Sequence, residues 1–209
     1  MVELANQFNN QNILIYGFGK SGRACFNYLK KNNKIIIYDD KNSSIPKNLK
    51  KYSINKLKLV SKNFDSIVIS PGIDANKCAL KKYLSKNKSK IISELDIFYL
   101  NNIKNKKITI TGTNGKSTTS KLLHDVLKKH GKDVRLVGNI GNPLLSEKNI
   151  KPLTIFVIEA SSYQIEYSKY FKTDFAIILN ISPNHLERHR TFKNYIKSKS
   201  RLIKSQKKN

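Results

Sequence analysis

The residues best suited to chemistry stand between a strand and a helix near the middle of the chain. Residues 108–119 read ITITGTNGKSTT, an alternating apolar strand followed by two glycines, a lysine and hydroxyl side chains. We predict a strand at 107–111 and an amphipathic helix at 120–130. The apolar residues placed on one face of that helix are Leu122, Leu123, Val126 and Leu127. A strand that turns through glycines into a helix directs backbone N–H groups at one point, which predicts a phosphate site.

The polar residues of this segment suit a nucleoside triphosphate. Lys116 supplies a mobile cation for the outer phosphates, and Ser117 supplies a hydroxyl ligand for Mg²⁺. The spacing departs from G-x-x-x-x-G-K-[ST], because Ile110 stands where the first glycine belongs. The alternative is a glycine turn before an ordinary helix. We predict that ATP binds to Gly112, Thr113, Asn114, Gly115, Lys116, Ser117, Thr118 and Thr119.

Two later strands also end in residues that can bind a ligand. The segment 154–159 is apolar on both faces, which is typical of a central strand in a parallel sheet, and it ends at Glu159. An acid beside a phosphate loop can hold Mg²⁺, whereas the alternative is an acid that faces solvent. A strand at 175–180 leads to His185, which is either a ligand or a structural histidine.

A second glycine turn lies near the start of the chain. A strand at 12–16 precedes GFGKSG at 17–22, and a strand at 34–38 ends at Asp39 and Asp40. This is the G-x-G-x-x-G pattern in a βαβ unit with an acid about twenty residues on. A carboxylate there can accept hydrogen bonds from a ribose or a base edge. Because this pattern alone is weak, an NAD-dependent dehydrogenase is an alternative.

The chain is predicted to be α/β with two nucleotide-type halves. The remaining predicted elements are strands at 66–69, 90–92 and 134–137, a turn at 70–73, and helices at 77–87 and 94–100. The polar stretch 101–106 is the natural linker. We therefore expect a Rossmann-like domain at 1–103, followed by a partial P-loop-type ATPase domain with a parallel sheet at 104–209.

Composition limits the partners and the compartment. The chain of 209 residues carries 40 Lys and Arg against 14 Asp and Glu, a net charge of +26. The basic residues are nearly all lysine and are spread along the chain, so we expect solvated helix faces and no nucleic-acid partner. Cys25 and Cys78 lie far apart, Met1–Gln7 does not read as a secretory signal, and no apolar run reaches about 20 residues. We expect a soluble, cytoplasmic monomer without a membrane partner.

Taken in order, the motifs resemble those of the Mur ligase family. The matching stretches are 17–22, 70–73, 110–118, 138–141, 159–166 and 185–189. The sequence EASSYQ at 159–164 favours the member that adds D-glutamate, with a ligase for another UDP-muramoyl intermediate as the alternative. The resemblance implies that ATP phosphorylates the L-alanyl carboxylate of UDP-N-acetylmuramoyl-L-alanine. The amine of D-glutamate then attacks the acyl phosphate.

The resemblance also implies roles for individual residues. Lys116 and two Mg²⁺ ions would bring the carboxylate and the γ-phosphate together. Ser117 and Glu159 would serve one metal, and His185 and a carbamylated Lys199 the other, with Lys197 as a competitor for the modification. Asn139 would lie near the reacting groups. The residues implied for the UDP precursor are Gly17, Gly19, Lys20, Ser21, Gly22, Asp39, Asp40, Ser70, Pro71, Gly72, Asn139 and Ser161.

Two features depart from the family pattern. The family usually reads D-H-L-D-R-H, whereas Asn184 and Glu187 occupy the acid positions here, which changes the charge around His185. The family also has a third domain that binds the incoming amino acid, and this chain ends after the helix that carries Lys199. We therefore expect the N-terminal portion of a ligase, which cannot complete D-glutamate addition by itself.

Overall fold

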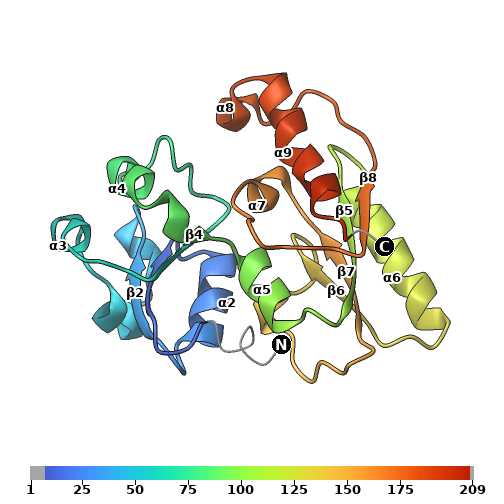
Figure 1. Cartoon of the computed structure of the whole chain (residues 1–209), viewed down its shortest axis with the longest axis horizontal. Helices are drawn as coiled ribbons and strands as arrows, with labels where there is room; N and C mark the ends of the chain where they lie inside the picture. Colours follow the sequence, from blue (N-terminus) through green and yellow to red (C-terminus); the bar gives the residue numbers. More distant parts are fainter. Residues whose placement is uncertain (1–7, 208–209) are drawn as a thin grey trace. The chain divides into compact units, whose positions relative to one another are not determined.

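The computed structural model describes residues 8–207 and divides into two compact units (Figure 1). Unit 1 is Met1–Asn101 and unit 2 is Asn102–Asn209, so the division falls two residues before the expected boundary. Residues 1–7, which carry the expectation of no secretory signal, lie outside the described residues, as do residues 208–209. Within the described part, no helix is long and apolar enough to cross a bilayer.

Unit 1 is built on a parallel sheet with the strand order β2-β1-β3-β4. Its strands are β1 (Asn12–Tyr16), β2 (Lys34–Tyr38), β3 (Ser66–Ile69) and β4 (Ile91–Ile92). Its α-helices are α2 (Lys20–Leu29), α3 (Lys56–Val60), α4 (Lys81–Lys86) and α5 (Glu94–Asn101). Short 3-10 turns lie at Asn42–Ser44, Lys47–Tyr52 and Lys88–Lys90.

The sheet of unit 1 forms where the sequence is most apolar. Ile13, Leu14 and Ile15 of the central strand β1 are completely buried, because parallel strands in the middle of a sheet are covered on both faces. The helix predicted at 77–87 is shorter than expected. The backbone carbonyl oxygen of Asp74 accepts from the N–H groups of Lys77 and Cys78, so the chain before α4 forms a turn.

Unit 2 contains a second parallel sheet, with the strand order β6-β7-β5-β8. Its strands are β5 (Lys106–Thr111), β6 (Val134–Gly138), β7 (Ile155–Glu159) and β8 (Phe175–Ile178). Its helices are α6 (Lys116–Lys129), α7 (Ser162–Glu166), α8 (Leu186–His189) and α9 (Phe192–Lys204), with a 3-10 turn at Leu144–Ser146. The predicted α/β class with parallel sheets is confirmed, and β7 is an interior strand as expected.

Helix α6 corrects two predictions. It begins at Lys116 instead of Ser120, because it continues directly from the glycine turn. Leu123 and Leu127 pack against the buried cluster of β-strand residues, but Leu122 is 63% exposed and Val126 is 45% exposed. The four residues lie within about 140° around the helix, as about 100° per residue requires, but only the Leu123 and Leu127 side of that face packs against the sheet.

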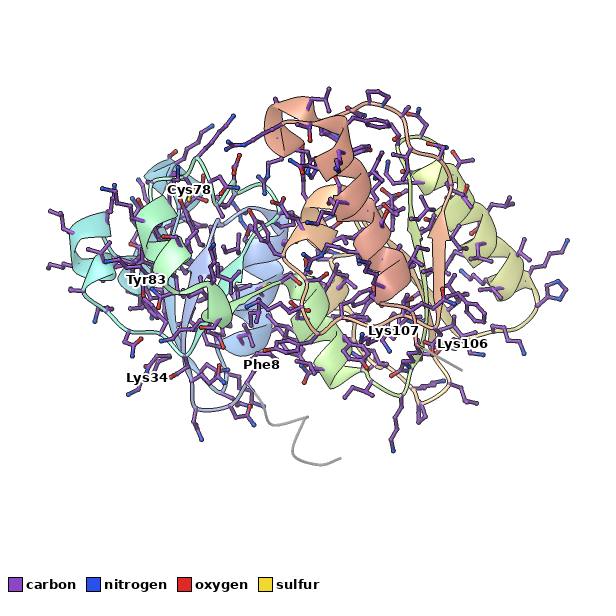
Figure 2. The ribbon with its side chains drawn as sticks, turned by 45° about the horizontal axis from the view of Figure 1, so that its top comes forward. Phe8, Lys34, Cys78, Tyr83, Lys106 and Lys107 are labelled. Carbon is purple, nitrogen blue, oxygen red and sulfur yellow. The ribbon has the colours of Figure 1, made fainter. Side chains whose placement is uncertain are left out.

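The start of β5 is fixed by a buried lysine. Lys106 and Lys107, both labelled in Figure 2, are adjacent at the start of the strand, but Lys106 is exposed and Lys107 is completely buried. The Lys107 ammonium donates to the carbonyl oxygens of Asn102, Ile103 and Asn105. Burial, together with the nearby Lys207 charge, lowers the pKa of Lys107 to about 8. The first residues of unit 2 are thereby tied to its sheet.

Candidate functional site

The candidate phosphate loop occupies Gly112–Gly115, between β5 and α6. Gly115 has a φ of 78° and precedes the first residue of α6, a conformation that favours glycine. Asn180, beyond the end of β8, holds this loop: its Oδ1 accepts from the N–H groups of Thr113 at 3.2 Å and Asn114 at 2.9 Å. Sequence reasoning missed Asn180, although a polar residue after a strand end was an available signal.

The loop presents some of its predicted ATP-binding residues to solvent and others to the interior. Asn114, Gly115, Ser117 and Thr118 are exposed. Thr113 is buried, and its hydroxyl accepts from the Ser182 N–H at 3.0 Å and lies 3.0 Å from the Tyr195 hydroxyl. The Lys116 ammonium donates to the Thr113 carbonyl oxygen at 2.8 Å. The Thr113 side chain therefore supports the loop from beneath.

A buried carboxylate lies beside the start of α6. Glu159, at the end of β7, is completely buried. Its Oε2 accepts from the Ser117 hydroxyl at 2.8 Å, and its Oε1 accepts from the Asn139 amide at 2.8 Å. A Cβ on Gly138 would meet the Glu159 carbonyl oxygen at 2.3 Å, so the close approach before Asn139 requires glycine. The fold thus brings Ser117, Asn139 and Glu159 together.

Lys199 of α9 also contacts the start of the loop. Its side chain donates to the Gly112 carbonyl oxygen at 2.7 Å and to the Thr111 hydroxyl at 3.3 Å. Only 2% of Lys199 is exposed, whereas Lys197 is an exposed residue. Burial, and then the charge of Lys116, lower the pKa of Lys199 to about 8. Of the two lysines considered for carbamylation, the buried one is at the loop.

His185 belongs to a neighbouring aromatic and charged cluster. Its Nδ1 lies 3.6 Å from a Glu187 carboxylate oxygen, and its ring centroid lies 5.0 Å from that of Tyr163. Tyr195 connects this cluster to the loop, because its ring is 6.4 Å from His185 and its hydroxyl contacts Thr113. Asn184, at one of the two departing positions, accepts the His185 backbone N–H at 2.8 Å.

The acidic and histidine side chains do not form a ready-made metal cluster. Across residues 8–207, no three His, Cys, Asp or Glu side chains gather at one point. A metal site at Ser117, Glu159, His185 and Lys199 would therefore also use the hydroxyl oxygen of Ser117 and a carbamate oxygen of modified Lys199. All of these donors except the imidazole are oxygens, the ligands that Mg²⁺ prefers.

The glycine turn of unit 1 depends on close backbone packing. Gly17 has a φ of 90°, and a Cβ on Gly22 would meet the Gly17 carbonyl oxygen at 2.0 Å. The Ser70 hydroxyl donates to that same oxygen at 2.7 Å, and the Ser70 N–H donates to the Tyr16 carbonyl at 2.9 Å. The turns after β1 and β3 therefore meet at the carboxyl edge of the sheet. Gly19, Lys20 and Gly72 are exposed there.

The carboxylates of Asp39 and Asp40, which follow β2, accept hydrogen bonds from groups within the protein. Asp39 accepts from the Phe18 N–H at 2.7 Å, and Asp40 accepts from the Tyr16 hydroxyl at 2.8 Å. Burial and hydrogen bonds to Cys78 and Asp40 raise the pKa of Tyr16. Ser21 donates to Glu94 in the same region. Asp39 thus fixes the shape of the glycine turn, whereas Asp40 holds the Tyr16 side chain, and the contact of either acid with a ligand stays a prediction.

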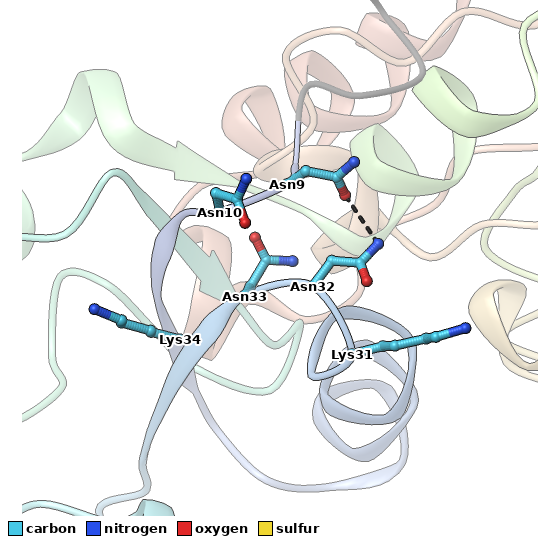
Figure 3. Close-up of a pocket in the computed structure, with 6 residues that line it drawn as sticks. All are labelled: Asn9, Asn10, Lys31, Asn32, Asn33 and Lys34. Atoms are coloured by element: carbon cyan, nitrogen blue, oxygen red, sulfur yellow. Dashed lines mark hydrogen bonds between the residues drawn. The ribbon is translucent and has the colours of Figure 1, made fainter.

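Two further features, Ser161 of unit 2 and a polar hollow of unit 1, lie in different parts of the fold. Ser161 forms a capping box with Gln164 at the start of α7, with its N–H donating to Gln164 Oε1 at 2.9 Å. A hollow of about 610 Å³ lies at the amino ends of β1 and β2, away from the glycine turn (Figure 3). Its lining residues are Asn9, Asn10, Lys31, Asn32, Asn33 and Lys34. None of the predicted site residues lines it.

Comparison with protein families assigns both units. Residues 11–93 match the family described as the Mur ligase MurD-like N-terminal domain, and residues 110–209 match the Mur ligase middle domain. Two similar proteins are both named UDP-N-acetylmuramoylalanine--D-glutamate ligase. The one from Rickettsia bellii is 37% identical over 92% of this chain and 43% of its own length. The one from Elusimicrobium minutum is 40% identical over 97% of this chain and 47% of its own length.

Solved structures agree at the level of the fold. A UDP-N-acetylmuramate:L-alanyl-gamma-D-glutamyl-meso-diaminopimelate ligase from Neisseria meningitides has a TM-score of 0.56 at 15% identity, over 96% of this chain and 69% of that one. A UDP-N-acetylmuramate-alanine ligase from Thermotoga maritima has a TM-score of 0.53 at 19% identity, over 94% and 48%. This chain spans less than half the length of the two curated relatives above. It belongs to the Mur ligase family, with a MurD-like N-terminal domain followed by a middle domain.

Proposed function

We propose that this chain supplies the precursor-binding and ATP-binding parts of a ligase that adds D-glutamate to UDP-N-acetylmuramoyl-L-alanine. The names of the similar proteins from Rickettsia bellii and Elusimicrobium minutum support this substrate class. We assign the UDP precursor to the domain at 1–103 and ATP to the domain at 104–209. The single observation that carries the proposal is the hydrogen-bonded group of Ser117, Glu159 and Asn139 beside the glycine loop.

The loop and the first turn of α6 suit the triphosphate of ATP. The start of the 14-residue helix α6, which follows the exposed residues Asn114 and Gly115, attracts anions, because the first N–H groups of a helix have no partner within it. Lys116 is the first residue of α6, and its flexible side chain can leave the Thr113 carbonyl oxygen for a phosphate oxygen. Lys116 therefore neutralises the outer phosphates.

The buried carboxylate fits a Mg²⁺ ion that accompanies ATP. Each oxygen of Glu159 has a short polar contact, one with a hydroxyl and one with an amide, and Ser117 can turn its own oxygen toward a cation. Ser117 and Glu159 would hold one ion, and His185 with a carbamylated Lys199 a second. When bound, Mg²⁺ offsets the negative charge of the phosphates that meet the substrate carboxylate.

The proposed reaction has two steps. The terminal phosphoryl group of ATP moves to the L-alanyl carboxylate of the precursor, which gives an acyl phosphate and ADP. The D-glutamate amine attacks the acyl carbon, the new C–N bond forms, and inorganic phosphate leaves while the amine loses a proton. Lys116 and Asn139 orient and stabilise the anionic groups, since fixed donors act most strongly where charge develops.

Carbamylation of Lys199 is consistent with its surroundings. The neutral amine adds CO₂ and releases a proton, so a lowered pKa favours the modification. Lys197 has no such environment, because it is an exposed residue of the same helix. The product carries an anionic oxygen ligand in place of a cation.

The glycine turn of unit 1 favours a UDP precursor over a dinucleotide. In a dinucleotide site the acid after the second strand bonds a ribose hydroxyl. Here the Asp39 carboxylate instead accepts the N–H groups of Phe18 and Lys41. This contact makes Asp39 part of the turn, and the exposed Lys20 is a cation of the same turn that can bind a diphosphate.

Isothermal titration calorimetry of the full chain tests this proposal. We expect UDP-N-acetylmuramoyl-L-alanine to bind, Lys20→Ala to weaken it about tenfold, and the exposed Lys30→Ala to leave it unchanged. NADH should give no heat of binding. Tight NADH binding without precursor binding would instead favour the dehydrogenase alternative and contradict the assignment of unit 1.

A further inference from the structure

A lysine-rich surface of unit 1 also exposes two apolar side chains. Residues 41–64 contain no acid, and Leu57 and Val60 of α3 are 82% and 47% exposed. Leu59, between them, is completely buried and anchors the helix to unit 1. The exposed lysines of this segment between residues 47 and 62 are Lys47, Lys50, Lys51, Lys56, Lys58 and Lys62.

A second basic segment adjoins the first. Residues 75–93 also lack acids, and the exposed lysines here are Lys77, Lys81, Lys82, Lys86 and Lys88. The Tyr83 hydroxyl of α4 donates to the Lys62 carbonyl oxygen at 2.8 Å, and Lys90 donates to the Asn63 side chain. Figure 1 draws α3 and α4 beside each other in unit 1, and Figure 2 labels Tyr83. We call residues 47–62 and 77–90 together the basic–apolar surface.

The charge of this surface selects an anionic partner. The two segments carry lysines without any acid, and the acids beside them are Asp40, which accepts the Ala79 N–H, with Asp65 and Asp74 nearby in the sequence. The lysines outnumber these acids, so the local charge is positive. A second copy of the same surface would bring like charges together, which opposes self-association. A polyanion is the complementary partner.

The side chains favour a lipid surface over a nucleic acid. Neither segment contains arginine, the residue that pairs best with phosphate and base edges. Tyr52 and Tyr83 are only partly exposed, so no open aromatic ring offers a base a stacking face. Exposed Leu57 and Val60 gain nothing from a phosphate backbone, but apolar side chains between lysines enter the headgroup region of a bilayer.

We propose that the basic–apolar surface binds peripherally to anionic phospholipid bilayers. The lysines bind the headgroup phosphates, and Leu57 and Val60 enter the boundary between headgroups and acyl chains. Helix α3 is too short to lie deep in the membrane, so the attachment is reversible and sensitive to salt. The sequence alone predicted no membrane partner, because no apolar run reaches the length of a membrane span; that criterion does not address peripheral binding.

Co-sedimentation with vesicles tests this proposal on the full chain. We expect binding to equimolar phosphatidylglycerol and phosphatidylcholine, and none to phosphatidylcholine alone. The triple variant K56Q/K58Q/K62Q should bind about 100-fold more weakly, and Leu57→Gln about tenfold more weakly. The matched control K128Q/K129Q/K132Q removes the same charge from exposed positions at the end of α6 and beyond it, and should change binding by less than about threefold.

Several results would overturn the proposal. Equal losses in the two triple variants would show attraction to net charge alone, and an unaffected Leu57→Gln would remove the apolar contribution. Binding to a DNA duplex with none to the anionic vesicles would assign the surface to a nucleic acid. Every substituted side chain is exposed, so we expect all variants to fold. Their melting temperatures check this expectation.

Discussion

Two lysines of α9 stand two positions apart but occupy different environments. Lys197 is exposed, whereas Lys199 is 2% exposed and hydrogen-bonded to the Gly112 carbonyl oxygen. Two residues turn an α-helix by about 200°, so they point to opposite sides. The sequence contains both lysines in a similar context and leaves the choice between them open. The contact between α9 and the loop distinguishes them.

The environment of Lys199 predicts a modification that depends on pH. With a pKa of about 8 instead of 10.5, the amine is about half neutral near pH 8, while an ordinary lysine there is neutral to less than about 1%. Carbamylation should therefore rise between about pH 6 and pH 9. Carbon-13 NMR with labelled bicarbonate should show a carbamate signal that Lys199→Gln removes and Lys197→Gln retains. Lys107→Gln identifies any signal from the other lysine with a pKa of about 8. A spectrum that Lys199→Gln leaves unchanged would contradict the assignment.

Asp39 shows that the spacing of residues in a sequence can place a side chain without identifying its hydrogen-bond partner. An acid at the end of a strand suggested contact with a ribose, and its position at the carboxyl edge was predicted correctly. Its contact with a ligand stays a prediction, but its hydrogen bond within the protein was not predicted, because the Phe18 N–H is 21 residues away and reaches Asp39 only through the parallel pairing of β1 with β2. Such contacts depend on the order of the strands in the sheet, which the hydrophobic periodicity of the sequence does not predict.

At the scale of elements, the strands were the most predictable part. The eight strands found within residues 8–207 lie close to their expected positions, since short apolar runs ending in glycine or polar residues are a strong signal. Helix α6 began four residues earlier than predicted, because the glycine turn feeds directly into it. The exposure of Leu122 and Val126 was missed, since the face of a helix that packs depends on the sheet beneath it.

The glycine turn of unit 1 predicts unequal effects of two alanine substitutions. Gly22→Ala places a Cβ 2.0 Å from the Gly17 carbonyl oxygen, so we expect a loss of about 3 kcal/mol in the free energy of unfolding. Gly19→Ala meets no atom within 4 Å and has an ordinary φ of −74°, so we expect a change within about 0.5 kcal/mol. Urea unfolding followed by circular dichroism measures both. Equal effects would contradict the close packing of this turn.

The whole molecule repeats one arrangement in two units. Each unit has a four-stranded parallel sheet among its described residues, and a strand followed by glycines leads into a helix at its carboxyl edge. This edge is where open α/β sheets bind ligands. The sequence predicted this duplication because both glycine turns and their flanking strands are local features. The match to two consecutive Mur ligase domains agrees with it.

Two ligands should therefore protect different units. We expect Mg-ATP to slow amide hydrogen exchange in peptides covering 108–138, and UDP-N-acetylmuramoyl-L-alanine to slow it in peptides covering 12–40 and 66–73. Ligand binding stabilises the segments that it orders, so the protection follows the site. Hydrogen exchange with mass spectrometry resolves these peptides. Protection of unit 1 by Mg-ATP and of unit 2 by the precursor would reverse the assignment.

Calorimetry with Mg-ATP tests the central claim most directly, namely that residues 112–119 hold the triphosphate. The wild-type chain should bind Mg-ATP, and Lys116→Ala should weaken binding at least about tenfold, since a hydrogen bond to a charged group is lost. Lys121→Ala, at an exposed position of the same helix, should bind like wild type. No binding to the wild-type chain, or equal affinity for Lys116→Ala, would contradict the claim.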